Sequence, residues 1–388
     1  MVSYHGFGSF KADDTGINAV FDRLKSIQID PINICGRNHE LVLQSRMNGF
    51  TADLLNGHLY KKRSLIEGWE KQASIFPTEE WPYFQRRRKE YREYIKSSDR
   101  GKALHEALPV VIKEIEKRGP LSSAQIEYDA VIDWRWAPAK AARAAMDALF
   151  DMGELVIAGR EHNRKIYDLA ERVLPAALLK GSDPNPADDE YNDYRILRRV
   201  KSMGLIWNRA GSGWLDTCKT AERNQSLKRL ENRELIFPVN IDGIRNTFYI
   251  PEEGVAHIGS GAVSNAVSLL APLDNMLWDR SMINEIFGFD YTWEVYKPAH
   301  TRQYGYYVLP VLAKDKFIGR IEPVMHKKND TKHGIDAGTL EIRNWWPEGN
   351  RQMSGSAENR LRKAIDNFAR FLNAKNVRLP PNKFHPPS

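Results

Sequence analysis

Five aliphatic residues recur three and four positions apart in one segment of the chain: Leu104, Leu108, Val111, Ile112 and Ile115. This spacing places them on one face of a helix, which Gly119-Pro120 should end. Ser122 or Ser123 then begins a second short helix, and Pro138 begins a third that runs to Gly153. Three consecutive helices are therefore predicted here.

A β-hairpin is predicted directly after these helices. The run Leu155-Val156-Ile157 leads through a polar turn into a returning strand over 165–169. Helices and a hairpin recur over 194–250, where Asp242-Gly243 supplies the turn. Because helices followed by a hairpin are the components of a winged helix, the chain is predicted to contain this unit twice.

The pattern changes to strands in the C-terminal part of the chain. Runs of β-branched, aromatic and aliphatic residues predict strands over 291–296, 305–312, 317–322 and 340–342. These strands would form a small barrel or sheet. A final amphipathic helix over 357–373 would carry four apolar residues on one face: Leu361, Ile365, Phe368 and Leu372.

The charge balance is moderately basic. The 388 residues include 57 Lys and Arg against 50 Asp and Glu, for a net charge of +7, which favours polyanionic partners but is also common in metabolic enzymes. Cys35 and Cys218 belong to no CxxC or Cys/His cluster, which argues against a disulfide framework or a structural zinc. No apolar run approaches the roughly 20 residues of a membrane span, and no secretion signal is recognised, so a cytoplasmic protein is expected.

The segment after the first long helix carries candidate chemistry. Its apolar period changes to two, so Ile27 and Ile29 should face the core while Gln28 and Asp30 point the other way. A carboxylate and an amide on one strand face can hold one water, with the carboxylate as base. Such a pair suffices for a hydrolysis that needs no metal or cofactor, although an exposed polar strand face is the commoner explanation of the spacing.

A resemblance to a known family strengthens the hypothesis that this segment is catalytic. Gln28-Ile29-Asp30-Pro31-Ile32-Asn33 with Arg37, His39 and Ser45-Arg46 resembles the corresponding segment of the YcaQ/AlkZ-type winged-helix DNA glycosylases, also called crosslink-repair glycosylases. Further matches follow in order along nearly the whole chain: Trp69 with Ala73-Ser74-Ile75-Phe76-Pro77; Trp136, Pro138 and Lys140; Gly153-Glu154-Leu155; Tyr167-Asp168-Leu169 with Glu171-Arg172; Leu273-Asp274-Asn275 with Trp278-Asp279-Arg280; Phe287-Gly288-Phe289-Asp290-Tyr291; and Arg302-Gln303-Tyr304-Gly305-Tyr306-Tyr307-Val308-Leu309-Pro310.

The resemblance implies a monofunctional DNA glycosylase that acts as a monomer on double-stranded DNA with alkylated or crosslinked purines. Gln28 and Asp30 fall on the two catalytic positions of the family. The aspartate resembles the broader crosslink-repair branch more than the antibiotic-resistance branch. An alkylated purine is already cationic, so a carboxylate that stabilises the oxocarbenium-like sugar and accepts a proton from water would suffice.

The implied fold is α+β, with tandem winged-helix units followed by a C-terminal β-barrel and a terminal helix. The expected domains are a shortened N-terminal winged-helix region with the catalytic strand (1–100), two winged helices (101–180 and 189–256) and the barrel region with the terminal helix (257–379). Two departures from the family stand out. The first helix is short, and Lys71-Gln72 replaces a common His-Glu pair.

Supporting or DNA-binding roles are expected for residues in or beside the matched motifs: Asn33, Arg37, His39, Arg46, Trp69, Arg160, Arg164, Lys165, Arg302, Gln303 and Tyr304. Arg160, Arg164 and Lys165 lie in the polar turn of the first hairpin, where phosphate contact is common. Asp274 and Asp279 are also candidate metal ligands, but a structural role is favoured because no histidine or third carboxylate lies at suitable spacing.

Two other classes of protein fit part of the pattern. A transcription regulator also needs winged helices and basic clusters, but it leaves Gln28 and Asp30 without a role. A structural nucleoid or adaptor protein would need neither the polar strand nor the barrel. A DNA glycosylase is therefore the favoured hypothesis.

Overall fold

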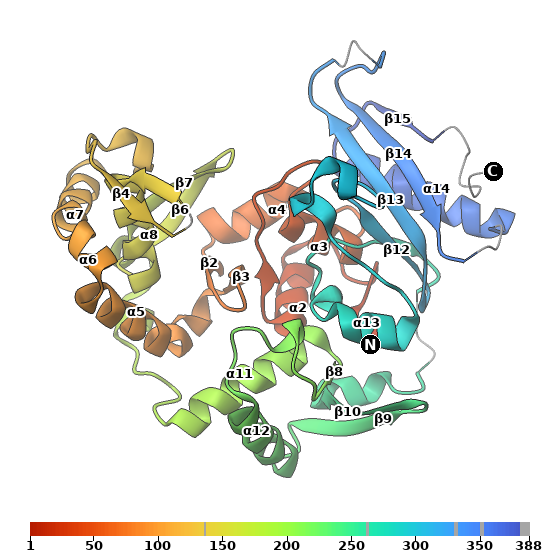
Figure 1. Cartoon of the computed structure of the whole chain (residues 1–388), viewed down its shortest axis with the longest axis horizontal. Helices are drawn as coiled ribbons and strands as arrows, with labels where there is room; N and C mark the ends of the chain where they lie inside the picture. Colours follow the sequence, from red (N-terminus) through yellow and green to blue (C-terminus); the bar gives the residue numbers. More distant parts are fainter. Residues whose placement is uncertain (136, 261–263, 330–332, 350–352, 381–388) are drawn as a thin grey trace. The chain divides into compact units, whose positions relative to one another are not determined.

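Helices and strands are mixed along the whole chain, which confirms the predicted α+β class (Figure 1). The structure is a computed structural model that describes residues 1–135, 137–260, 264–329, 333–349 and 353–380. Trp136, one of the residues in the matched motifs, lies outside the described residues. The chain forms two units, Met1–Leu55 with Asp189–Ser388, and Asn56–Asp188.

The first unit begins with short helices. They are α1 (Val2–His5), α2 (Asp14–Leu24), α3 (Asn38–Arg46) and α4 (Ala52–Asn56), with the short strand β1 (Ile27–Gln28) between α2 and α3. The Asp13 side chain accepts a hydrogen bond from the Gly16 N–H and so caps α2. The apolar stripe of α2 is fully buried, as its spacing predicts: Ile17, Val20, Phe21 and Leu24.

A five-stranded sheet forms the C-terminal part of this unit. Its order is β11 (Val267–Leu269), β12 (Leu309–Ala313), β13 (Lys316–His326), β14 (Thr339–Pro347) and β15 (Asn376–Arg378), with only the β14–β15 pair parallel among the described strands. Helix α14 (Gly355–Phe371) packs against β11 and β15 and buries three of the four expected residues, Leu361, Ile365 and Phe368. Leu372 lies one residue beyond the helix and is only partly buried.

The sheet is open, so the expected closed barrel is wrong. Within the described part of the chain, β11 pairs only with β12, and β15 pairs only with β14. Both edge strands have only three residues, so each open edge of the sheet is short.

Two predicted strands also differ from the structure, since one is absent and one starts later. Residues 291–296 form no strand but end in the 3-10 helix η7 (Glu294–Tyr296), and β12 begins only at Leu309 instead of residue 305. The carboxylate of Glu294 accepts hydrogen bonds from the backbone N–H groups of Gln303, Tyr304 and Gly305. These groups are therefore not available to a sheet ladder.

The repeat over 194–250 has the predicted order of elements. It contains α11 (Asp188–Met203), β8 (Ile206–Trp207), α12 (Thr220–Asn232), β9 (Ile236–Ile241) and β10 (Ile244–Pro251), and the strands form an antiparallel sheet of order β8-β10-β9. Gly204 ends α11 with a φ of 67°, and Gly243 provides a φ of 82° in the hairpin turn. The unit's identity as a winged helix stays a prediction.

The remaining helices of the first unit are short. They are α13 (Arg280–Phe287) and the 3-10 turns η4 (Ser212–Trp214), η5 (Glu252–His257), η6 (Asn275–Leu277) and η8 (Ala299–Thr301).

The second unit contains the other predicted repeat. Its helices are η1 (Gly57–Lys61), η2 (Thr78–Phe84), α5 (Gln85–Ser97), α6 (Asp99–Leu104), α7 (Ala107–Arg118), η3 (Ser123–Gln125), α8 (Ala141–Met152), α9 (Ala170–Val173) and α10 (Ala176–Lys180). Its strands form the hairpins β2 (Leu65–Trp69) with β3 (Ala73–Pro77), β4 (Val131–Trp134) with β5 (Ala137–Lys140), and β6 (Leu155–Glu161) with β7 (Arg164–Leu169).

The hairpin β4–β5 corrects the expected start of the third helix. Pro138 lies in β5 opposite Asp133, and α8 starts three residues later at Ala141. A proline is tolerated in this strand because, among the described strands, β5 pairs only with β4 and forms an edge of a two-stranded sheet. The predicted end of α8 is correct, since Gly153 has a φ of 77°.

A buried ion pair joins distant parts of the first unit. Arg46, at the end of α3, binds both carboxylate oxygens of Asp274 at 2.7 and 2.9 Å, and both side chains are fully buried. Its guanidinium also donates to Nδ1 of His5 at 2.9 Å, and burial together with Arg46 lowers the pKa of His5 to about 3. Burial opposes ionisation of Asp274, but Arg46 holds its pKa below the usual value.

We predict that Asp274→Asn strongly destabilises the protein. The substitution leaves the Arg46 charge buried without its counter-ion, and breaking a buried pair in this way costs about 3–5 kcal/mol. The measurement is the urea unfolding midpoint at neutral pH, with Asp99→Asn as the control because Asp99 is 95% exposed in its ion pair with Lys102. Equal midpoints for the two variants would contradict the assignment.

The pH dependence of stability tests the same pair. Because the pKa of Asp274 is lower in the folded state, its contribution is present above the unfolded-state pKa and is lost as pH falls through the folded-state pKa. The wild type should therefore lose more stability on acidification than Asp274→Asn does.

Candidate active site

Gln28 and Asp30 lie directly after α2, where Lys25 adopts a φ of 60° and turns the chain into β1. The two side chains are each only 8% exposed, so they do not form a solvated strand face. Regular strand structure ends at Gln28, and Ser26 and Ile27 are fully buried. The expected alternation of buried and exposed positions is therefore wrong, and Gln28 and Asp30 are enclosed polar groups.

Two asparagine amides hold the backbone of this segment. The Asn275 side chain donates to the carbonyl of Ser26 at 2.9 Å, and the Asn38 side chain donates to the carbonyl of Gln28 at 2.8 Å. The Asn38 oxygen accepts a hydrogen bond from the Leu273 N–H at 3.0 Å. Alternate carbonyls are thus fixed from α3 and from the turn that also carries Asp274.

The loop after Asp30 is held by its own side chains and by the sheet. Asp30 Oδ1 accepts from the Ile32 N–H at 2.8 Å, and Asn33 Oδ1 accepts from the Gly36 N–H at 3.2 Å. The Ile34 carbonyl accepts from the Met325 N–H of β13 at 3.0 Å. Asn33, expected as a supporting residue, therefore shapes the loop.

The surroundings of Asp30 suit a general base, because the protein compensates only part of the charge of its carboxylate. Burial raises the pKa of Asp30, and the Ile32 N–H only partly offsets this effect. Gln28 Oε1 is buried and has no hydrogen-bond partner among the described residues. A carboxylate and an amide oxygen with remaining capacity can together orient a water molecule.

Three other predicted residues belong to α3 and its start. Arg37 begins the helix in a capping arrangement, in which its backbone N–H donates to Glu40 at 2.8 Å. His39 is 7% exposed, and Arg46 is completely buried in its ion pair. A direct DNA contact by Arg46 is therefore incompatible with its position, and its supporting role is structural.

Arg302, Gln303 and Tyr304 surround Glu294. Gln303 and Tyr304 bind the Glu294 carboxylate through their backbone N–H groups, while Arg302 donates to the Lys297 carbonyl at 2.9 Å. A β-carbon on the following Gly305 would lie 2.5 Å from the Glu322 carboxylate, which explains the glycine.

Of the site residues predicted in the second unit, three contact other side chains and Arg164 is exposed. Trp69 lies under the Arg135 guanidinium at 5.6 Å, and Arg160 forms an ion pair with the buried Glu67. Lys165 lies 3.6 Å from Asp147, whereas Arg164 is exposed at the hairpin end. Arg164 is therefore the most accessible of the three hairpin cations.

Sequence analysis missed the two asparagines that position the segment. Asn38 and Asn275 are ordinary polar residues in the sequence, and only the fold brings them to β1. The matched motif Leu273-Asp274-Asn275 was a signal for one of them. Asp279, a candidate metal ligand, instead caps α13 and accepts from the Trp207 indole at 2.9 Å.

No group of three or more His, Cys, Asp or Glu side chains in the described ranges is arranged to hold a metal ion. In the same ranges, no helix is long and apolar enough to cross a membrane.

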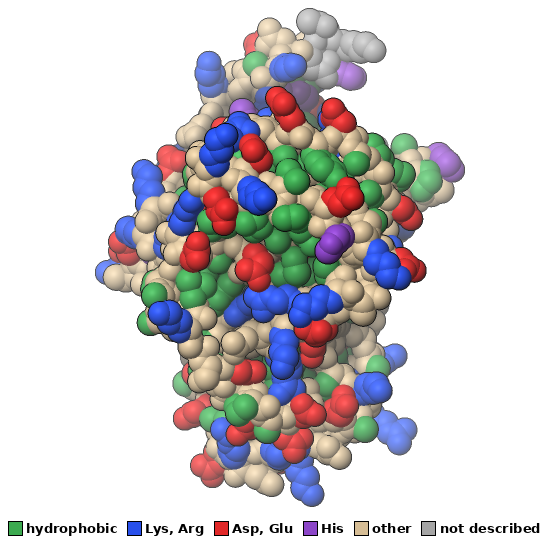
Figure 2. All heavy atoms as spheres, turned by 90° about the vertical axis from the view of Figure 1, so that its left-hand side faces the viewer, with side chains coloured by type: hydrophobic (Ala, Val, Ile, Leu, Met, Phe, Trp, Pro, Cys, Tyr) green, Lys and Arg blue, Asp and Glu red, His purple; other side chains and the backbone are tan. Residues whose placement is uncertain are grey.

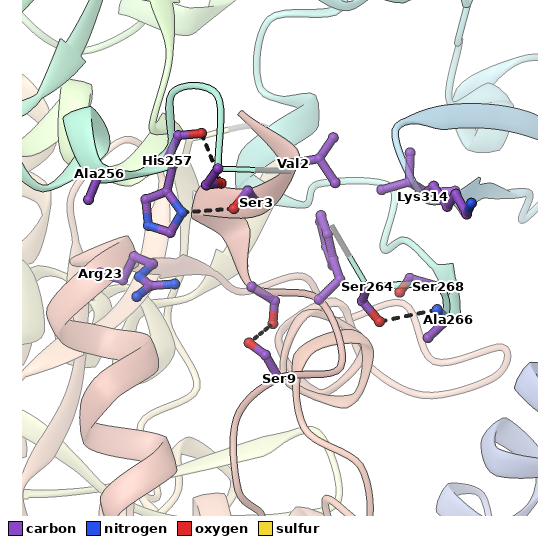
Figure 3. Close-up of a pocket in the computed structure, with 14 residues that line it drawn as sticks. Val2, Ser3, Ser9, Arg23, Ala256, His257, Ser264, Ala266, Ser268 and Lys314 are labelled. Carbon is purple, nitrogen blue, oxygen red and sulfur yellow. Dashed lines mark hydrogen bonds between the residues drawn. The ribbon is translucent and has the colours of Figure 1, made fainter. Parts of the chain in front are cut away.

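A separate pocket of about 330 Å³ lies in the first unit (Figure 3). Arg23 and Lys314 lie at opposite sides of it, and Ser3 and His257 are joined by a 2.8 Å hydrogen bond in its wall. Gln28 and Asp30 are not among its lining residues. This pocket is therefore distinct from the candidate active site.

The net positive charge is not gathered on the face drawn in Figure 2. Lys and Arg side chains are interspersed there with Asp and Glu side chains. Individual basic positions, such as Arg164, are therefore better candidates for phosphate contact than this face as a whole.

Comparison with known proteins defines the class. The family model described as DNA glycosylase AlkZ-like matches residues 21–371, which include Gln28, Asp30 and the motif at 302–310. The chain therefore belongs to the AlkZ-like DNA glycosylase family and is a DNA glycosylase that acts on DNA.

A solved structure has a similar fold. It is the DNA glycosylase AlkZ of Streptomyces sahachiroi, with 14% sequence identity, a TM-score of 0.57, and coverage of 93% of this chain and 92% of that one. The alternative of a transcription regulator has no support in these comparisons.

We predict that Asn38→Ala slows base release about tenfold, because it removes a buried hydrogen bond that fixes the Gln28 backbone. The measurement is the single-turnover rate on substrate duplex, together with DNA affinity, which should change little. Asn48→Ala is the matched control, since Asn48 also donates to a backbone carbonyl but lies at the surface. Equal rates for the two variants would show that the Asn38 hydrogen bond does not position the site.

Proposed function

We propose that this DNA glycosylase hydrolyses the N-glycosidic bond of N-alkylated purines in double-stranded DNA, with Asp30 as the base and Gln28 as the group that orients water. The observation that carries the proposal is the enclosed pair itself. Asp30 has a raised pKa and one backbone N–H partner among the described residues, and Gln28 has a buried oxygen with hydrogen-bonding capacity.

The electron and proton changes balance with these two residues. As the C1′–N bond breaks, its electron pair moves to the base and neutralises the positive charge that alkylation placed there. The water oxygen forms the new bond to C1′, and Asp30 takes the released proton. The products are a free alkylated base and an abasic site, and Asp30 returns the proton to solvent.

A cationic leaving group explains why so small a site suffices. A normal purine must be protonated before it leaves, whereas an N3- or N7-alkylated purine already carries the charge. The Asp30 carboxylate then stabilises the oxocarbenium-like sugar while it accepts a proton from water. Purines in interstrand crosslinks share this chemistry, and we extend the proposal to them.

The two repeated units would bind DNA as winged helices. The protein would act as a monomer. The helix and hairpin order of 101–180 and 189–256 supports this assignment, with 1–100 and 257–379 as the flanking regions. Arg164 in the first hairpin would contact phosphate directly. Arg160 and Lys165 would do so after exchanging their carboxylate partners, and Arg302, Gln303 and Trp69 are further candidate contacts.

We predict that Asp30→Asn abolishes most release of 7-methylguanine from duplex DNA, because the charge acting on the transition state is lost while the side-chain size is kept. Gln28→Ala should slow release by a smaller factor. Both are measured under single turnover as heat-labile abasic sites, with DNA affinity nearly unchanged. The control is Asp22→Asn, an exposed aspartate on α2. Full activity of Asp30→Asn would exclude Asp30 as the base.

The pH profile of the same reaction provides an independent check. The base must be ionised, so activity should fall as pH decreases through the pKa of Asp30. Since burial raises that pKa, the acid limb should lie at a higher pH than for an exposed aspartate. Gln28→Ala should show the same acid limb. Loss of the acid limb in this variant would indicate that a group other than Asp30 is the base.

We predict that Arg164→Ala weakens binding to alkylated and undamaged duplexes by similar factors, because phosphate contacts carry no lesion information. The slope of log affinity against log salt should fall by at most about 0.9 for one lost contact. Salt-resolved binding curves measure this, with Lys102→Ala as an exposed control. Adding Arg160→Ala and Lys165→Ala should lower the slope further. An unchanged slope in the triple variant would remove this hairpin from the DNA interface.

A further inference from the structure

Tyr296 is the most exposed large hydrophobic side chain in the described part of the chain, at 80%. Single exposed apolar residues are common and need no function. This one differs because its ring lies at the end of a row of aromatic side chains and on a firmly held turn.

The turn that carries Tyr296 is fixed by a buried carboxylate. Glu294, two residues earlier, accepts backbone hydrogen bonds from Gln303 at 3.0 Å and Tyr304 at 2.7 Å, and it pairs with Lys297 at 2.8 Å. Burial opposes ionisation of Glu294, but these donors lower its pKa to about 2. The carboxylate therefore stays charged, and the turn that presents Tyr296 is held in place.

The aromatic row leads from the protein interior to Tyr296. The rings of Tyr307 and Trp293 meet edge to face with centroids 6.1 Å apart, and those of Trp293 and Tyr296 do so at 5.8 Å. Tyr307 is only 1% exposed. The exposed ring of Tyr296 thus rests on a packed support, which limits the entropy lost when a ligand covers it.

Strand β13 contacts both the loop after Asp30 and the segment that carries Tyr307. The Met325 N–H donates to the Ile34 carbonyl at 3.0 Å, and the Glu322 carboxylate accepts from the Tyr306 N–H at 3.0 Å. Burial raises the pKa of Tyr296, and the charge of the Asp30 carboxylate raises it further. Burial also raises the pKa of the Tyr307 hydroxyl, and the charges of Cys35, Tyr291 and Asp30 raise it further. The aromatic row and the segment of the candidate base are therefore held by the same strand of the first unit.

A cation flanks the aromatic face as well. The Arg302 guanidinium donates to the carbonyl of Lys297, the residue after Tyr296, at 2.9 Å, and it lies 4.9 Å from the centroid of Tyr306. Arg302 could bind a phosphate next to a base that covers Tyr296.

We propose that Tyr296 stacks on the alkylated purine whose glycosidic bond Asp30 attacks, and that it selects for the positive charge of that base. The inference rests on the proposed function. The electron-rich face of a tyrosine attracts a cation, and the adjacent carboxylate adds to the attraction. An undamaged, neutral purine gains only the stacking component, so the ring favours the lesion.

The test uses the full-length protein and two duplexes that are not cleaved. One contains 2′-fluoro-7-methylguanosine, which keeps the cationic base on a stable sugar, and the other contains a tetrahydrofuran abasic analogue, which has no base. Tyr296→Ala should weaken binding to the first duplex about tenfold, the scale of one lost base–aromatic stack, and leave the second unchanged. Tyr296→Phe should restore binding, because the ring face is kept.

Controls separate stacking from a general effect. Tyr94→Ala removes another exposed tyrosine, 41% exposed on α5, and should change neither affinity. The thermal midpoint of Tyr296→Ala should match the wild type, because little of the side chain is buried. Equal weakening on both duplexes would assign Tyr296 to the DNA around the lesion, and unchanged binding to both would remove it from the interface; either result overturns the proposal.

A separate assay distinguishes failure of the proposed function from failure of the stacking inference. Wild-type protein is assayed in parallel for release of 7-methylguanine from an ordinary methylated duplex. If no base is released, the proposed substrate is wrong. If release is normal and Tyr296→Ala still distinguishes the two duplexes as the wild type does, only the stacking inference fails.

Discussion

The ion pair of Arg46 and Asp274 connects the elements on which the candidate site depends. Its two residues are 228 positions apart, and neither is exposed to solvent. Removing two charges from water is unfavourable unless their mutual attraction and further hydrogen bonds offset it, and Arg46 makes such bonds to Asp274, Val42, Ser45 and His5. The end of α3 and the turn at 273–275 are thereby held together.

The positions of Gln28 and Asp30 follow from this junction. Asn38 at the start of α3 and Asn275 in the turn each donate to a backbone carbonyl of the segment, so the strand is fixed by side chains from both partners of the junction. A site that stabilises charge needs such fixed groups, since a mobile carboxylate would reorganise during the reaction. The structure therefore relates one buried electrostatic interaction to the geometry of the candidate site.

The second constraint is the pair of carboxylates under the motif at 302–310. Glu294 and Glu322 accept the backbone N–H groups of Gln303, Tyr304, Gly305 and Tyr306. This arrangement delays the start of β12, presents Tyr296 and requires glycine at position 305. The motif at 302–310 is therefore held largely through its backbone N–H groups.

Local spacing in the sequence was sufficient for α2, α14 and the hairpin β6–β7, because a stripe or an alternation reports on one element at a time. The single helix predicted from Leu104 to Ile115 is wrong at its start, since Leu104 ends α6 and α7 begins at Ala107. The family was also recognisable from the sequence, and Gln28 and Asp30 were identifiable there as candidate residues. Local patterns could not reveal that the C-terminal sheet stays open, that 291–296 is not a strand, or that Gln28 and Asp30 are enclosed. The last two features depend on Glu294, Asn38 and Asn275, whose hydrogen-bond partners lie 9 to 249 positions away and meet only when the chain has folded.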